Sequence, residues 1–362
     1  MYQAIHYDDH GPMTDPCRYL RRHDLVYRRP ALRPYDGVPV GTGDAGGLLY
    51  QTAYGLELTV NHADALDYAP DGAMQAWAWE AEERQTAPVS CGHLSIRSTL
   101  PIFDWVYLEA FEQRLILSTA SIEGRAKTPF AEASWKLYAP REPEIEQTEE
   151  AALEIQIDKW PSPSFFHHYE QILDIHDKNL YCVRAEANRD ALLVTQALRR
   201  CRTALAVSCG GEPEQLNSHA VCCRFPKQKR HRLTLYLAAR ASAEASVREN
   251  TLAALTAAKD APSLWQTHCR YWQDFWSRSF LHLQENDYLE NLCYLHLYQM
   301  GCGNLGKNPL TFAGLWGWFR DARNWGHFYH WNHQQNYWGL YAVGHGKPIS
   351  VIFAIAFFAA GE

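Results

Sequence analysis

The runs Leu153-Glu-Ile-Gln-Ile157 and Leu56-Glu-Leu-Thr-Val60 alternate apolar and polar residues one by one. This alternation puts every second side chain on the same face, which is typical of a β-strand with one buried face. Similar runs, separated by Gly, Pro, Asn and Asp, lie at 93–97, 115–119 and 231–237. Many short strands with turn residues between them predict a large all-β sandwich over residues 1–242.

The hydrophobic period changes after residue 242. Residues 243–259 and 263–279 are rich in Ala, Leu and Trp at helical spacing, so we assign 243–285 to a helical linker. A third helix is expected over 286–300, ended by the glycines at 301 and 303, and it is apolar on nearly every side. Such a helix belongs inside a larger helical assembly, so 286–348 is predicted to hold the first helices of a second domain.

The final segment, 349–362, has a different character. Val351 to Ala360 are ten consecutive apolar residues, and the polar patterning is lost after Pro348. A run of this length is too short to cross a bilayer. We interpret the segment as an aberrant tail, produced by a frameshift or a truncation.

The composition limits the class of protein and its partners. A 362-residue chain with 47% hydrophobic and 21% charged residues is globular and long enough for two domains. The formal charge of −7 argues against a nucleic acid or an anionic membrane as partner. No signal peptide is seen at the start, so we expect a cytoplasmic protein with reduced thiols, or an extracytoplasmic one if a leader is missing. Its oligomeric state is left open.

Aromatic residues are concentrated near the end of the chain. Between Phe312 and Tyr341, 11 of 30 residues are aromatic, and five of the 13 tryptophans lie among Asn, Gln, His and Arg. Flat apolar rings beside uncharged hydrogen-bonding groups suit a sugar, although the window could also be plain core. The candidate sugar-binding residues are Trp316, Asp321, Arg323, Trp325, Trp331, His333, Gln335, Asn336 and Trp338.

Two other patterns have ordinary explanations. The segment Gly41-Thr-Gly-Asp-Ala-Gly46 matches a dinucleotide-binding motif, but strand-like sequence follows it, so a tight turn between strands is the better interpretation. His327, His330 and His333 repeat every three residues, yet the only acid between Glu290 and Glu362 is Asp321. We expect no metal and no cofactor, with these imidazoles hydrogen-bonding to a sugar or to the backbone. The cysteines lack zinc-ligand spacing, and Cys222 and Cys223 are interpreted as buried apolar residues.

Two motifs together suggest a family. Pro309-Leu-Thr-Phe-Ala-Gly-Leu-Trp316, followed by Trp331-Asn-His-Gln-Gln-Asn-Tyr-Trp338, resembles the start of the catalytic barrel in glycoside hydrolase family 95. The known activities of that family are α-L-fucosidase and α-L-galactosidase, and its pattern there reads approximately P-x-x-L-Q-G-L-W and then N-I-N-x-x-M-N-Y-W. The glycine turn at 37–47 and the helical segment at 272–279 are also similar to parts of the family.

The resemblance implies a β-sandwich, a helical linker and the start of an (α/α)6 barrel, with an inverting mechanism. In the family two asparagines position the attacking water; Asn332 matches the second, and His330 stands at the first. Gln335 replaces a methionine and would add a hydrogen bond to the sugar. The sugar pocket would be lined by residues that match the family by position, namely Trp316, Asn336 and Trp338.

The catalytic carboxyl groups are the main departure from the family. Inverting hydrolysis needs two of them about 6.5–9.5 Å apart. Asp321, the only acid in the barrel portion before Glu362, lies between arginines, where ion pairing is the expected role. We therefore expect the acid and base to lie beyond residue 362, and the chain alone to be inactive.

The chain is accordingly interpreted as the N-terminal part of an exo-glycosidase that removes α-linked fucose-like or neutral hexose residues from glycans. The alternative is a non-catalytic protein in which the sandwich itself binds carbohydrate or has a structural role. Sugar binding by residues 1–242 alone would favour this alternative, whereas binding that needs Trp316 to Trp338 would favour the enzyme.

Overall fold

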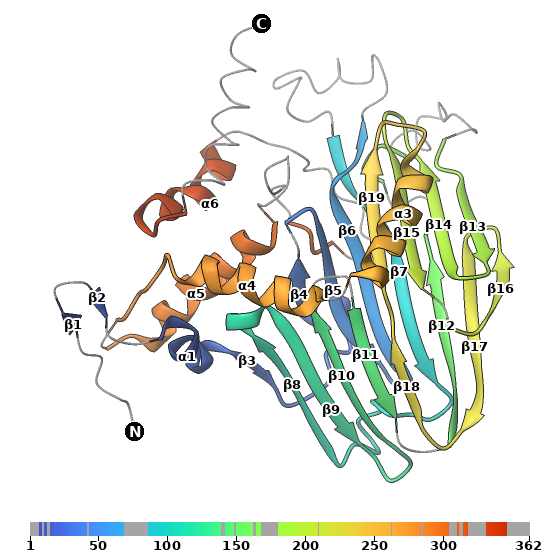
Figure 1. Cartoon of the computed structure of the whole chain (residues 1–362), viewed down its shortest axis with the longest axis horizontal. Coiled ribbons are helices and arrows are strands. Elements are labelled where there is room, and N and C mark those ends of the chain that lie inside the picture. The colour runs from blue at the N-terminus through green and yellow to red at the C-terminus, as the bar shows by residue number, and fades with distance from the viewer. Residues whose placement is uncertain are drawn as a thin grey trace, which may run out of the picture.

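A computed structural model describes most of the chain (Figure 1). The described residues are 7–8, 11–12, 15–41, 43–68, 86–138, 142–147, 150–161, 164–167, 180–208, 210–261, 263–283, 285–303, 310, 314–317 and 331–345.

One layer of the sandwich is a seven-stranded antiparallel sheet. Its strands, in spatial order, are β16 (Glu212–Asn217), β17 (Ala220–Gln228), β12 (Ala151–Asp158), β7 (Thr86–Ser98), β6 (Gly55–Tyr68), β5 (Ala45–Thr52) and β4 (Val38–Gly41).

Two smaller antiparallel sheets form the other layer. The six-stranded sheet contains β18 (His231–Thr234), β11 (Glu142–Gln147), β10 (Glu132–Tyr138), β9 (Ser121–Lys127), β8 (Ala110–Ile116) and β3 (Leu25–Tyr27). The four-stranded sheet contains β13 (Val183–Asn188), β14 (Ala191–Ala197), β15 (Arg202–Ser208) and β19 (Leu237–Ser242). A separate hairpin pairs β1 (Tyr7–Asp8) with β2 (Gly11–Pro12).

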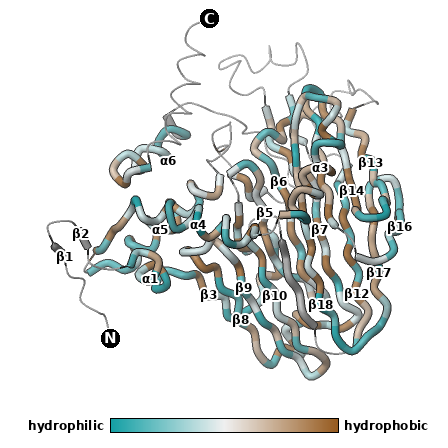
Figure 2. The backbone as a smooth tube through the Cα atoms, in the orientation of Figure 1, coloured by the Kyte–Doolittle hydropathy of each residue, from teal (hydrophilic) through white to brown (hydrophobic). Residues whose placement is uncertain are grey.

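Both smaller sheets cover the same face of the large one. Gln51 on β5 donates a 2.9 Å hydrogen bond to Gln113 in the six-stranded sheet. Gly92 on β7 lies against Leu205 in the four-stranded sheet. The register places Gln51 and Gly92 on one face, because Gly47 lies four residues before Gln51 and aligns with Gly92 across β6. Figure 2 shows the hydrophobic colouring along the strands that enclose this core.

The predicted β-sandwich is confirmed, and the quoted alternating runs at 56–60, 93–97 and 153–157 lie within β6, β7 and β12. The run at 115–119 does not stay extended, because a 3-10 turn, η4 (Leu117–Thr119), follows β8. The run at 231–237 is likewise divided between β18 and β19. At Leu117 the backbone leaves the ladder because its N–H donates to Asp24 and its carbonyl accepts from Trp276.

Helices follow the last strand, which ends at Ser242, the predicted end of the sandwich. The remaining helical elements are α1 (Pro16–Leu20), η1 (Arg21–His23), η2 (Pro34–Asp36), α3 (Val247–Asp260), α4 (Leu264–Trp276), α5 (Asp287–Gly303) and α6 (Trp331–Ala342). The predicted linker helices correspond to α3 and α4. The structure shows a large antiparallel sandwich followed by a few helices, and its described residues do not show the barrel that the resemblance implied.

The linker helices pack on the sandwich. On α3, Val247 and Leu255 pack against Leu193 and Ala206 of the four-stranded sheet. The aromatic stripe of α4 is core, since Trp272 and Trp276 are almost completely buried. The Trp276 indole N–H donates to the Leu117 carbonyl at 2.8 Å, and His268 donates to the Thr119 carbonyl at 2.6 Å. These bonds attach α4 to the turn that ends β8.

The end of α5 differs from the prediction. Gly301 and Gly303 were expected to stop the helix, but they are its last turn. A Cβ at Gly301 would lie 2.9 Å from the Trp272 ring, so glycine allows α4 and α5 to pack closely. At the other end of α5, Tyr288 and Leu289 are exposed, which the expectation of a helix buried on all sides did not anticipate.

The cysteines also need a correction. Cys222 and Cys223 are both completely buried, as expected, and the Cys222 thiol is free. Cys223, however, is disulfide-bonded, whereas reduced thiols were expected. Within the described part of the chain, no helix is long and apolar enough to cross a membrane.

Gly301→Ala should lower the free energy of unfolding by about 1–3 kcal/mol, because the added methyl group overpacks the α4–α5 contact. Gly339→Ala in α6 is the matched control, since a Cβ there meets nothing within 4 Å. It should raise stability by about 0.5–1 kcal/mol through helix propensity. Urea denaturation followed by tryptophan fluorescence measures both, and equal effects of the two changes would contradict this account.

Candidate functional site

The structure describes only some of the candidate sugar-binding residues. Side chains are described for Trp316, His333, Gln335, Asn336 and Trp338. Trp331 and Asn332 are the first residues of α6, and their side chains are not described. The predictions for Asp321, Arg323, Trp325 and His330 lie outside the described residues.

The segment 314–317 is attached to the sandwich. The buried Asn61 amide on β6 donates to the carbonyls of Leu315, at 2.9 Å, and Gly317, at 3.1 Å. Leu315 is buried directly against Gly46, where a Cβ would lie 2.6 Å from the leucine Cβ. The Trp316 indole N–H donates to the Val40 carbonyl at 3.2 Å. Trp316 is therefore a partly buried ring whose polar group is bound to the protein.

The glycine turn between β4 and β5 holds the end of α5. The Gly43 N–H donates to the Cys302 carbonyl at 2.5 Å, and the Tyr298 hydroxyl donates to the Pro39 carbonyl at 2.7 Å. A Cβ at Gly41 would lie 2.6 Å from the Cys302 oxygen. The glycines thus let the turn approach the helix terminus, and the prediction of a turn between strands is confirmed by the β4–β5 pairing.

Helix α6 has a buried face. His333, Tyr337 and Leu340 are at most 2% exposed and recur at helical spacing. The His333 Nε2–H donates to the Leu310 carbonyl at 2.6 Å. The histidines were predicted to hydrogen-bond either to a sugar or to the backbone, and His333 bonds to the backbone.

The opposite face of α6 combines an amide with aromatic rings. Gln335 is exposed, and Trp338 and Tyr341 are 58% and 56% exposed. Their spacing of three residues puts them side by side along one helix face. Asn336 is also exposed, but it precedes Trp338 by two residues, so its side chain lies on nearly the opposite side of the helix. Its backbone carbonyl accepts a 2.9 Å hydrogen bond from His296 on α5. The structure therefore brings Gln335 and Trp338 together and separates Asn336 and His333 from them.

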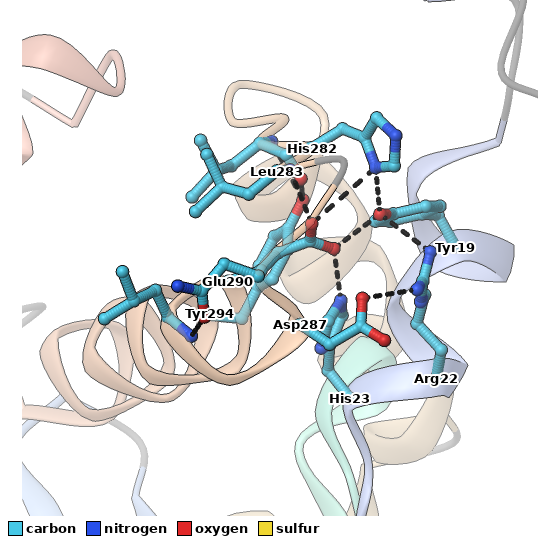
Figure 3. Close-up of polar contacts among 11 residues, drawn as sticks. Tyr19, Arg22, His23, His282, Leu283, Asp287, Glu290 and Tyr294 are labelled. Carbon is cyan, nitrogen blue, oxygen red and sulfur yellow. Dashed lines mark hydrogen bonds and ion pairs between the residues drawn. The ribbon is translucent and has the colours of Figure 1, made fainter.

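A buried carboxylate lies at the start of α5 and was missed in the sequence (Figure 3). Glu290 is completely buried. It accepts hydrogen bonds from the Tyr19 hydroxyl, from His23 Nε2–H at 2.6 Å and from the Leu283 N–H at 2.7 Å. Figure 3 shows these donors converging on it from α1, η1 and the segment before α5. An Arg22–Asp287 ion pair at 2.8 Å lies beside them.

The hydrogen bonds of this cluster keep the buried Glu290 ionised. Burial acts to raise the pKa of Glu290, but the hydrogen bonds from Tyr19, Leu283 and His23 outweigh it and leave the pKa below its ordinary value. Burial lowers the pKa of His23, which favours a neutral imidazole that donates from Nε2. The carboxylate is completely buried, and its hydrogen-bond donors come from α1, η1 and the segment before α5. Glu290 is therefore an anchor between the N-terminal segment and α5.

In the described part of the chain, no group of three or more His, Cys, Asp or Glu side chains is arranged to hold a metal ion.

Comparisons with known proteins agree with the fold. No family model and no curated protein sequence matches this chain. A protein of the human microbiome assigned as a kojibiose phosphorylase is similar in structure, with a TM-score of 0.52 and 14% identity over 81% of this chain and 44% of that one. A family GH92 α-mannosidase from Bacteroides thetaiotaomicron aligns over 74% of this chain and 39% of that one, with 8% identity and a TM-score of 0.35.

The likeness to the phosphorylase shows the sandwich fold alone, because the identity is so low. The α-mannosidase match is too weak to add to it. This chain spans less than half the length of the phosphorylase, with 44% of that chain covered.

Glu290→Gln should lower the free energy of unfolding by about 2–4 kcal/mol, because the new amide nitrogen faces the donors of Tyr19 and His23. Glu214→Gln is the matched control, since Glu214 forms an exposed ion pair with Arg224. The control should cause a much smaller loss. Urea denaturation at pH 7 measures both variants, and equal losses would show that Glu290 is not an anchor.

The same cluster should make the protein less stable in acid. The folded pKa of His23 lies below the ordinary 6.5, so the unfolded state takes up protons first and stability falls as the pH drops below about 6.5. A further loss is expected as the pH falls below the ordinary pKa of 4.5 through the lower folded pKa of Glu290. Denaturation from pH 7 to 2 measures this profile, and Glu290→Gln should remove the second loss. A stability that does not change between pH 7 and 2 would contradict this account.

Proposed function

We propose that this chain belongs to an enzyme that acts on glycosidic bonds, and that the exposed face of α6 binds the sugar. The observation that carries the proposal is the pairing of Gln335 with the exposed ring of Trp338 on one helix face. An exposed indole offers a surface for the C–H face of a sugar, and an amide both donates to and accepts from hydroxyl groups. The likeness to a protein assigned as a kojibiose phosphorylase supports a glycan as the ligand.

The finer proposal follows the family 95 motifs. The ligand would be an α-linked fucose-like or neutral hexose residue, and the reaction an inverting hydrolysis. Residues 331–345 contain no charged side chain other than histidine, which favours a neutral sugar over an acidic one.

In this proposal the acid and base are not among the 362 residues of this chain. Between 285 and 345 the described acids are Glu285, Asp287 and Glu290. Asp287 pairs with Arg22, and Glu290 is buried under its hydrogen-bond donors. Asp287 and Glu290 are thus occupied by partners within the protein, and in this proposal the described residues contribute binding and orientation to the reaction.

Binding can be measured by tryptophan fluorescence with L-fucose, D-galactose and 2′-fucosyllactose. Trp338→Ala should weaken binding about tenfold, equivalent to about 1.4 kcal/mol, because the stacking surface is lost. Tyr288→Ala removes a similarly exposed aromatic ring from α5 and should leave binding unchanged. Wild-type affinity in the Trp338 variant would overturn the proposed site.

Catalysis is tested separately with 4-nitrophenyl α-L-fucoside. The purified 362-residue chain should bind sugar without releasing nitrophenol. Substantial turnover would contradict the assignment of the acid and base.

The rival function is a non-catalytic protein whose sandwich binds carbohydrate. It predicts that Trp338→Ala leaves binding intact. The fluorescence series with the monosaccharides therefore shows whether the sugar is bound on α6 or elsewhere, and the nitrophenyl assay addresses catalysis.

A further inference from the structure

One end of the sandwich exposes aromatic side chains far from α6. They lie on three neighbouring connections: the β5–β6 turn, the loop 99–109 and the β9–β10 turn. The exposed rings are Tyr54 (50%), Trp105 (74%), Tyr107 (42%) and Phe130 (42%). The other end of β8 is the Leu117 turn that α4 binds, so the seven residues of the strand, about 20 Å, separate this end from the helices. Figure 1 shows the start of β8 at the bottom of the view and α6 at the upper left.

Hydrogen bonds and ring contacts hold these connections together. The Phe103 N–H donates to the Ala53 carbonyl at 3.0 Å, and the buried Phe103 ring packs edge-on against Trp135 at 5.3 Å. The rings of Tyr107 and Phe130 are in edge contact at 5.0 Å. The exposed aromatics are therefore presented by an ordered surface, which lowers the entropic cost of binding a ligand.

A groove of about 820 Å³ adjoins the aromatic rings. Its floor is the outer face of β8, β9 and β10, where Glu112, Arg125 and Ser134 are aligned across the strands. The next row aligns Ala110, Lys127 and Glu132. Glu109 follows Tyr107 by two residues and pairs with Lys127 at 3.6 Å, so the groove begins where the aromatic loop ends.

The charges in the groove are nearly balanced. Its basic residues are Arg28, Arg125, Lys127 and Arg230, and its acidic residues are Glu109, Glu112 and Glu132. Arg28 pairs with Glu112, and Lys127 pairs with both Glu109 and Glu132. A groove of this kind has little net attraction for a polyanion, yet it offers many donors and acceptors to hydroxyl groups. Charged residues are depleted at the centre of protein interfaces, which makes a second protein a poorer occupant.

We infer that this end of the sandwich is a second binding site for a neutral oligosaccharide, which stacks on Trp105 and Tyr107 and extends into the groove over β8–β10. This site goes beyond the proposed function of α6, because its residues and its position are separate. It would keep the protein on a long glycan while the distant α6 site engages a sugar residue.

A printed array of neutral glycans, probed with the fluorescently labelled full-length chain, tests the inference. Trp105→Ala combined with Tyr107→Ala should reduce the signal of at least one bound glycan by tenfold or more. Arg125→Ala should reduce the same signal about three- to tenfold by removing donors from the groove. Tyr288→Ala, at 71% exposure an equally exposed ring on α5, should leave it unchanged. Unchanged melting temperatures would show that the variants are folded.

Trp338→Ala separates this site from the one on α6. The signal that depends on Trp105 should persist in that variant, even if binding at α6 fails altogether. The inference is overturned if no array glycan depends on Trp105 and Tyr107, or if all binding is lost with Trp338→Ala. It is also overturned if the wild-type chain is a dimer by light scattering and the Trp105→Ala, Tyr107→Ala variant is a monomer, because the aromatic surface would then be a protein interface.

Discussion

The buried backbone carbonyls between the sandwich and the helices need hydrogen-bond donors, and the rest of the structure depends on how they are supplied. A buried carbonyl without a partner would cost free energy comparable to a lost hydrogen bond. Trp276 and His268 supply donors to the turn after β8, and Tyr298 supplies one to Pro39 on β4. Gly43 supplies another to the end of α5. These bonds fix where each helix lies, while apolar packing alone would be less directional.

The packing between the sandwich and the helices also determines which side chains of α6 are exposed. The hydrophobic core continues without a break from the sandwich into α4, α5 and the buried face of α6. His333 and Tyr337 fill the inner side of α6, so Gln335 and Trp338 are left outside. A sugar on this face would therefore be held by a helix that His333 attaches to the Leu310 carbonyl and His296 attaches to α5.

Local patterns in the sequence were sufficient to predict the sandwich and helices α3 and α4, because the hydrophobic period of a strand or helix depends only on neighbouring residues. They failed where distant residues decide. Gly301 looks like a helix stop, but its role depends on Trp272 in another helix. Glu290 gave no signal because its donors, Tyr19 and His23, lie more than 260 residues away. For α6 the sugar-binding residues remain a prediction, and the direction of each side chain could not be read from the sequence because it depends on the packing of His333 against Leu310.

The two surfaces assigned to carbohydrate solve the same chemical problem differently. On α6 the ring of Trp338 is combined with an uncharged amide, and no ion pair is needed to neutralise the surface. On the sandwich the hydrogen-bonding groups are charged, and Lys127 with Glu109 and Glu132 keeps them nearly neutral as a set. Charges of opposite sign placed side by side give a small net field, so this surface has donors and acceptors for hydroxyl groups without a strong attraction for ions. Both arrangements favour a ligand rich in hydroxyl groups and free of charge, and an aromatic ring beside each provides the apolar contact that water cannot.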